Sequence, residues 1–282
     1  MSLLELVGEV AAVVALMHVA SIAVVLGRSF LDPRTVGPAL SRMSRRVSRP
    51  LAALVAVLAV NGVVRRVGVE LSWVIGVNAT TAIYAIEGTF VAWIQSFATP
   101  AATAYFSFVY VFGYVYLLTF PVVAYALCED TRALRTLIVA YGINYGVGVV
   151  CYVLIVAYGP RNFMPDLVGS LLFESWPRSQ LLTSQVNENT NVFPSLHTSL
   201  AATVAMLAVR TRRRYPRWTP IAVGLGASIA VSTMYLGIHW ATDVVFGTVL
   251  AAGSVLAAER YETYRNRDGD DGGGTDGTDG HR

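Results

Sequence analysis

Lysine is absent from this chain of 282 residues, and charge of either sign is scarce. All 21 basic side chains other than histidine are arginine, and charged residues make up 14% of the sequence, against about 25% in ordinary soluble domains. Hydrophobic residues make up 55%, and the mean hydropathy is +0.55. This composition excludes a soluble globular enzyme, a disordered chain and a nucleic-acid-binding protein, and it predicts a protein of the lipid bilayer.

Cysteine is also scarce, and Cys128 and Cys151 are the two residues of this type. Neither has a histidine or a second cysteine nearby at the spacing of metal ligands. The sequence therefore predicts neither a disulfide framework nor a zinc site. Both cysteines lie in or beside apolar runs, where a free cysteine acts as a small packing residue.

Long apolar runs account for most of the chain. A helix of about 20 apolar residues, rising about 1.5 Å per residue, crosses the hydrocarbon core of a bilayer. We predict an all-α fold, a polytopic bundle of six or seven transmembrane helices. The expected spans lie at residues 3–27, 50–64, 101–127, 136–158, 194–209, 218–236 and 240–258.

The second of these runs, residues 50–64, is marginal in length because it stops at Arg65 and Arg66. It spans only if neighbouring helices bury it or if its flanking arginines reach toward the headgroups, and without it six spans remain. The next segment, residues 67–100, mixes polar and apolar residues and contains tryptophans that favour the headgroup level. We expect this segment to be interfacial or re-entrant.

Arginines gather in two links between apolar runs, at residues 28–49 and 210–217. Links rich in arginine stay on the cytoplasmic side of a membrane, so both are expected inside. A signal peptide has its positive charge before its apolar region, whereas Arg28 follows the first apolar run. We therefore predict that this run is a membrane helix. This threading predicts a multi-pass cell-membrane protein with an external amino terminus, an external segment at 159–193 and a cytoplasmic tail.

Four regions follow from this pattern. Residues 1–66 hold the first membrane helices and an arginine-rich loop, residues 67–100 form the interfacial segment, and residues 101–260 form the main membrane core. Residues 261–282 are expected to form a disordered acidic tail. Its stretch 268–280 contains aspartate and glycine and no apolar residue, which predicts disorder in water.

Two of the four histidines are candidates for chemistry. His18 lies within an apolar run and His281 in the tail, where packed or solvated histidines are ordinary. His197 and His239 each begin an apolar run on the predicted external side. Asp243 follows His239 by four residues, so both share one helical face, and the carboxylate can orient the ring as a base or nucleophile. A His/Asp pair with this spacing is also common as a purely structural hydrogen bond. It indicates catalysis only where a second catalytic group lies close to it.

The segments around these histidines resemble the type 2 phosphatidic acid phosphatases and vanadium haloperoxidases. Residues 194–197, Pro-Ser-Leu-His, are similar to the second motif of that family, Pro-Ser-Gly-His. Residues 232–243 match the spacing of the third family motif: Ser-Thr, then five residues, His, three residues and Asp. The family motif has arginine where this chain has Thr233. Leu196 in the second motif and Thr233 in the third are similar to the residues at these positions in the branch that includes inositol phosphorylceramide synthases. The resemblance covers roughly residues 101–258.

The first family motif, Lys, six residues, Arg-Pro, has a weaker counterpart. The near-match at residues 42–50 lies on the predicted cytoplasmic side and is rejected. Arg161 lies on the external side before the second motif and is the better counterpart, although Leu154 stands at its lysine position. Arg178 is a second cation in the same segment, and either arginine could instead be a headgroup anchor.

The resemblance implies a reaction at phosphorus. His239 would attack to form a phosphohistidine, Asp243 would orient it, and His197 would protonate the leaving alcohol. No metal or cofactor is expected, because two histidines and one carboxylate are too few ligands for a two-metal route. The residues implied for binding the phosphate are Arg161, Ser195, Thr233 and Arg178.

The resemblance thus implies an integral-membrane phosphatase that acts on a lipid phosphate or isoprenoid diphosphate at the external face. Two of the three cations usual in the family are missing, which disfavours a dianionic monoester and favours a phosphodiester or pyrophosphate. One alternative is a transferase that passes a phosphoryl-headgroup to an alcohol. Another is a non-catalytic membrane transporter or scaffold, because polar groups within the membrane also mark permeation paths. A vanadate-dependent oxidase is disfavoured because its relatives are soluble.

Overall fold

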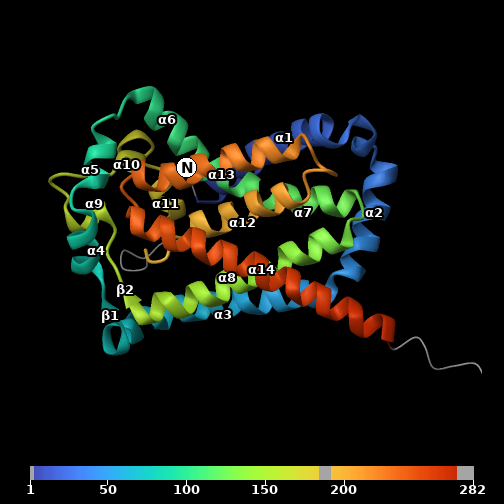
Figure 1. Ribbon diagram of the computed structural model, residues 1–282. Helices are drawn as coiled ribbons and strands as arrows, with labels where there is room; N and C mark the ends of the chain where they lie inside the picture. The colour runs from blue at the N-terminus through green and yellow to red at the C-terminus, as the bar shows by residue number, and fades with distance from the viewer. Residues whose placement is uncertain (1–2, 184–191, 272–282) are drawn as a thin grey trace, which may run out of the picture.

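The computed structural model describes residues 3–183 and 192–271 (Figure 1). This part of the chain is all-α apart from one short parallel pair, β1 (Val77–Asn78) with β2 (Ile155–Val156). Four helices in it are long and apolar enough to cross a membrane, so the protein is a membrane protein. They are Leu3–Leu26, Pro100–Leu127, Thr131–Leu154 and Ala241–Arg265.

The long helices form a bundle, and shorter helices cover its two ends (Figure 1). The short helices α4 (Thr80–Glu87), α5 (Phe90–Gln95), α9 (Pro160–Phe163) and α10 (Leu171–Ser175) lie at the left end, while α2 (Pro33–Arg46) lies at the right. The remaining elements are α1 (Leu3–Ser21), η1 (Ile22–Leu26), η2 (Arg28–Leu31), α3 (Ser48–Ile75), α6 (Pro100–Phe108), η3 (Val109–Gly113), α7 (Tyr114–Leu127), α8 (Thr131–Leu154), α11 (Ser179–Thr183), α12 (Leu196–Arg210), α13 (Trp218–Tyr235) and α14 (Ala241–Asp271).

The short apolar run at 50–64 is part of a longer helix. α3 continues through Arg65 and Arg66 and has 28 residues, which corresponds to about 42 Å at 1.5 Å per residue. It packs along α8, and no proline follows Pro50 to interrupt it before it ends at Ile75. We expected residues 67–100 at the interface. Residues 67–75 instead continue α3, and the short helices α4 and α5 follow.

Both arginine-rich links lie at the same end of the bundle. Arg42 in the first link donates a hydrogen bond of 2.7 Å to Glu129, and Arg214 in the second link pairs with Asp130 at 3.0 Å. Both acidic residues belong to the turn between α7 and α8. The two links thus meet at one turn, as expected if they share one side of the membrane.

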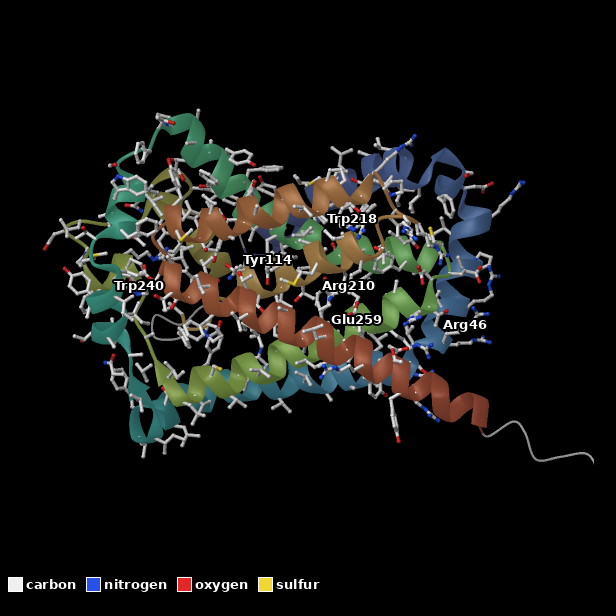
Figure 2. The ribbon with its side chains drawn as sticks, viewed as in Figure 1. Arg46, Tyr114, Arg210, Trp218, Trp240 and Glu259 are labelled. Atoms are coloured by element: carbon white, nitrogen blue, oxygen red, sulfur yellow. The ribbon has the colours of Figure 1, made fainter. Side chains whose placement is uncertain are left out.

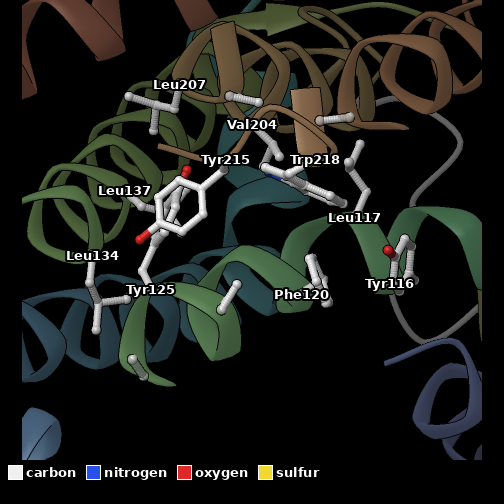
Figure 3. Close-up of a cluster of buried hydrophobic side chains, with 14 of the residues drawn as sticks. Tyr116, Leu117, Phe120, Tyr125, Leu134, Leu137, Val204, Leu207, Tyr215 and Trp218 are labelled. Atoms are coloured by element: carbon white, nitrogen blue, oxygen red, sulfur yellow. The ribbon is translucent and has the colours of Figure 1, made fainter. Parts of the chain in front are cut away.

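The centre of the bundle is packed with aromatic and aliphatic side chains (Figure 3). The rings of Phe120 on α7 and Trp218 on α13 are 4.7 Å apart between centroids, and both side chains are fully buried. Burying such large apolar side chains joins the central helices to one another. The other residues labelled in this cluster are Tyr116, Leu117, Tyr125, Leu134, Leu137, Val204, Leu207 and Tyr215.

Helix α14 extends further than the apolar run that defines its start. It is helical through Asp271, so residues 261–271, which we expected in a disordered tail, are helical. Ion pairs fasten this extension to the bundle: Arg210 lies 2.7 Å from Glu259 (Figure 2), and a partly buried pair joins Arg135 and Glu262 at 3.3 Å. The rest of the expected tail, 272–282, lies outside the described residues.

A glycine on α14 lets this helix approach the start of α12. A Cβ at Gly247 would lie 2.5 Å from the carbonyl oxygen of Ser195, a backbone atom that cannot rotate away. We expect Gly247→Ala to lower the thermal unfolding midpoint in detergent, because overpacking costs about 1–3 kcal/mol. Gly253→Ala on the same helix is the control, since a Cβ there meets nothing within 4 Å. Equal melting temperatures for the two variants would contradict this close helix contact.

Candidate active site

His197 and His239 face each other at the end of the bundle opposite the arginine-rich links. Their ring centroids are 6.2 Å apart. His197 is the second residue of α12, and His239 lies in the turn between α13 and α14. Figure 2 shows the neighbouring Trp240 at the left end and Arg46 at the right end of the bundle. The two motifs, separate in sequence, therefore meet in one place.

Asp243 holds the ring of His239. The Nδ1 atom of His239 is 3.3 Å from Oδ2 of Asp243, and the same oxygen accepts a hydrogen bond of 2.9 Å from the backbone N–H of Trp240. The 3.3 Å separation is long for a charge-assisted hydrogen bond. Asp243 is completely buried, so its carboxylate is available to the ring and not to solvent.

The turn that carries His239 is built by Thr233 and Gly237. The backbone carbonyl of Thr233 accepts hydrogen bonds of 3.0 Å from the N–H groups of both Ile238 and His239. Gly237 has a φ of 72°, a conformation that glycine adopts without steric cost. The hydroxyl of Thr233 donates to the carbonyl of Ala230 at 2.8 Å. Thr233 thus shapes the turn with its backbone, and its hydroxyl bonds within α13.

His197 is placed by the start of its helix and by two aromatic rings. Ser195 is the N-cap of α12, where its buried hydroxyl accepts a 3.3 Å hydrogen bond from the N–H of Thr198 and donates to Oγ1 of Thr198 at 3.0 Å. The ring of His197 contacts Tyr110 and Tyr114 at centroid distances of 4.8 Å and 4.5 Å. The cap and the two tyrosines together restrict the orientation of this histidine.

Arg161 on α9 reaches the same site, whereas Arg178 is exposed in the turn between α10 and α11. The backbone N–H of Arg161 donates to the carbonyl of Gly237 at 3.1 Å, and its guanidinium lies 4.5 Å from the ring centroid of Phe173. Its Nη1 atom is buried and has no hydrogen-bond partner in the described part of the chain. A buried cationic donor of this kind is suited to an anionic ligand.

Burial controls the protonation of His239. The pKa of this histidine falls from the usual 6.5 to about 3, chiefly because of burial; a hydrogen bond to the backbone of Val192 opposes this shift, and the positive charge of Arg161 adds to it. Burial also lowers the pKa of Arg161, although arginine keeps its charge in proteins. At neutral pH His239 is therefore uncharged, and one ring nitrogen carries the lone pair that a nucleophile needs.

The arrangement combines a neutral histidine held by a carboxylate, a second histidine across a gap, and a buried arginine. These are the parts required for nucleophilic attack, proton donation and charge neutralisation at an anionic centre. Among the described residues, no group of three or more His, Cys, Asp or Glu side chains has a spacing suited to a metal ion.

Sequence reasoning missed Glu87, Tyr110 and Tyr114 at this site. Glu87 accepts hydrogen bonds from the first backbone N–H groups of α14, and the tyrosines contact His197. One signal for Glu87 was available, because an acidic residue in an apolar membrane segment usually has a specific partner. Nothing in the spacing of the tyrosines distinguished them from packing residues.

A family model described as the PAP2 superfamily matches residues 81–257, which is more than half of the chain. The match includes both histidine motifs, Arg161 and Glu87. Searches of curated proteins and of solved structures found no match.

Proposed function

This chain belongs to the PAP2 superfamily, that of the type 2 phosphatidic acid phosphatases, and we propose that it is a membrane phosphatase with a phosphohistidine intermediate. Its substrate is a lipid phosphate or an isoprenoid diphosphate. The observation that carries the proposal is the buried Nη1 of Arg161, an atom with no hydrogen-bond partner among the described residues, on an arginine beside two facing histidines. A phosphate oxygen would satisfy this donor and would place phosphorus between the rings.

The mechanism has two steps. The free ring nitrogen of His239 attacks phosphorus, the bond from phosphorus to the leaving oxygen breaks, and His197 gives that oxygen a proton. Water then attacks the phosphohistidine, His197 takes a proton from it, and phosphate leaves as His239 is regenerated. Asp243 stabilises the charge that develops on the ring of His239. Arg161 neutralises the oxygens around phosphorus in both steps.

Arg161 lies beside the two histidines, and its single positive charge favours a phosphate group of low negative charge. A single guanidinium neutralises one negative charge, so a phosphodiester or pyrophosphate group fits the site better than a dianionic monoester. Leu196 and Thr233, which stand at motif positions similar to those of the inositol phosphorylceramide synthases, favour a second candidate. In that reaction an alcohol replaces water as the acceptor of the phosphoryl-headgroup.

A screen of purified protein in detergent tests the function. Phosphatidic acid, phosphatidylglycerol phosphate and isoprenoid diphosphates are supplied with water as the sole acceptor, and released phosphate is measured. Release by the wild type and not by His239→Ala supports the phosphatase, and a chelator is expected to leave the rate unchanged. Turnover only after an alcohol lipid is added would identify the transferase. Equal results for wild type and variant with every substrate would favour the non-catalytic alternative.

The proposed topology has seven spans, formed by α1 with η1, α3, α6 with η3 and α7, α8, α12, α13 and α14. The amino terminus and the site are outside, and the arginine-rich links and the tail are inside. Its support is that both links lie at one end of the bundle and the histidines at the other, together with the cytoplasmic preference of arginine-rich links.

Cysteine labelling in intact cells tests this topology. In a background with Cys128 and Cys151 replaced by serine, Arg213→Cys should react with an impermeant maleimide only after the membrane is opened. Asp166→Cys, an exposed position near Arg161, is the matched control and should react in intact cells. Labelling of Arg213→Cys from outside would reverse the topology and the external site with it.

A further inference from the structure

The first turn of α14 has no side-chain cap from its own N-terminal residue. Trp240 occupies the N-cap position, and its indole N–H is a donor that cannot accept a hydrogen bond. Asp243 reaches back to the backbone N–H of Trp240 at 2.9 Å, which is one half of a capping box. The other half would be an N-cap side chain that accepts a hydrogen bond, which Trp240 cannot supply. The first N–H groups of the helix have no partner within it, so an acceptor for them must come from elsewhere.

Glu87 supplies this acceptor from a distant part of the chain. Its Oε2 accepts a 2.9 Å hydrogen bond from the N–H of Ala241, 154 positions later in the sequence, and its Oε1 accepts from the N–H of Thr242. Both carboxylate oxygens are thus engaged at the positive end of the helix dipole, where a negative charge is stabilised. Glu87 completes the cap of the helix that carries Asp243.

The helix that carries Glu87 is itself attached to the catalytic turn. Thr80 on α4 accepts a 3.0 Å hydrogen bond from the N–H of Tyr158, and the carbonyl of Tyr158 accepts one of 2.8 Å from the indole of Trp240. The ring of Tyr84 lies 6.2 Å from that of Trp240, and Trp240 is fully buried. α4 is therefore held against Trp240 at several points, and Glu87 approaches α14 from a fixed position.

We infer that Glu87 is a positioning residue for the His239–Asp243 pair. The inference rests on the proposed function, in which His239 is the nucleophile. Oδ2 of Asp243 bonds both to the ring of His239 and to the N–H of Trp240, so a movement of the first turn of α14 moves the carboxylate relative to the ring. A displacement of about 1 Å in a catalytic group can cost about 10²-fold in rate.

Replacing the carboxylate by an amide tests the inference. Glu87→Gln keeps the shape of the side chain, but one of its two oxygens becomes an NH2 group. This group is a donor facing a backbone N–H donor, so one of the two hydrogen bonds is lost. We expect kcat to fall about 10- to 100-fold, with KM within about twofold of wild type because Arg161 is untouched. Asp32→Asn is the matched control: Asp32 caps α2 at the other end of the bundle, where it accepts from Arg34 N–H at 2.9 Å. This control should retain wild-type kcat.

A double variant shows whether Glu87 acts through Asp243. In the Asp243→Asn background, Glu87→Gln should change kcat by less than about twofold, because the group that it positions has already been altered. Wild-type kcat in Glu87→Gln, or an equal loss with and without the Asp243 carboxylate, would overturn the inference.

Hydrogen exchange provides a readout that does not depend on turnover. The amides of Ala241 and Thr242 should exchange faster in Glu87→Gln than in the wild type, while those in the middle of α14 should be unchanged. Equal exchange in the two proteins would overturn the inference even if activity falls. If the wild type turns over no substrate, the proposed function fails, and faster exchange at these amides would still show that Glu87 holds the start of α14.

Discussion

His239→Ala is expected to abolish turnover of alkyl and aryl phosphates alike, with a loss of at least about 10⁴-fold in kcat. The reason is that the ring supplies the atom that bonds to phosphorus, and an activated leaving group does not replace that atom. Single-turnover assays with both kinds of substrate measure the effect. Acid-labile phosphate bound to the wild-type protein and missing from the variant would identify the intermediate.

His18→Ala is the matched control for this experiment. His18 is a half-buried histidine, whereas His239 is buried; the Nδ1 of His18 lies 2.8 Å from the carbonyl oxygen of Val14, and its ring packs against Tyr116 and Phe120. It belongs to α1 and not to the site, so we expect normal turnover from this variant. Turnover by His239→Ala at a rate close to that of His18→Ala would show that His239 is not the nucleophile.

His197→Ala should slow the departure of a poor alkoxide leaving group by about 10²- to 10⁴-fold, the usual contribution of a general acid. An activated aryl phosphate needs little proton donation, so the variant should recover much of that factor on an aryl substrate. The measurement is kcat for a series of phosphates with leaving groups of increasing acidity. The rate of His197→Ala should depend more steeply on the acidity of the leaving group than the wild-type rate.

Asp243→Asn provides the comparison for this assignment. It keeps the ring of His239 but removes the carboxylate 3.3 Å away, so its activity should lie between those of the two histidine variants on the aryl substrate. Aryl phosphatase activity in His239→Ala together with none in His197→Ala would exchange the two roles.

Local sequence patterns predicted much of the fold. Four of the predicted apolar runs coincide with the four helices that are long and apolar enough to cross a membrane, because the thickness of the bilayer sets the number of apolar residues that a spanning helix needs. The arginine-rich links predicted which ends of these helices lie together, and the ion pairs of Arg42 and Arg214 bring both links to the turn at 128–130. Helix ends were predicted less well, since α3 passes through Arg65 and Arg66 and, as a whole, packs along α8.

Part of the candidate site could likewise be predicted from the sequence, and part could not. The pairing of His239 with Asp243 was predictable because a spacing of four residues places two side chains on one face of a helical turn. Position in the sequence favoured Arg161 over Arg178, but its contact with the site was not predictable. Both arginines lie in one polar segment, and the packing of α9 and α10 directs Arg161 to the histidines.

The sequence by itself thus determined the membrane class, the two histidine motifs and the local geometry of the His239–Asp243 pair. The tertiary structure decided which distant groups lie at the candidate site: Arg161, whose Nη1 has no partner among the described residues, and Glu87 on the first N–H groups of α14. The physical reason is the range of the interactions. Helical spacing acts over four residues, whereas the partner of a helix end 154 positions away depends on how the whole bundle packs.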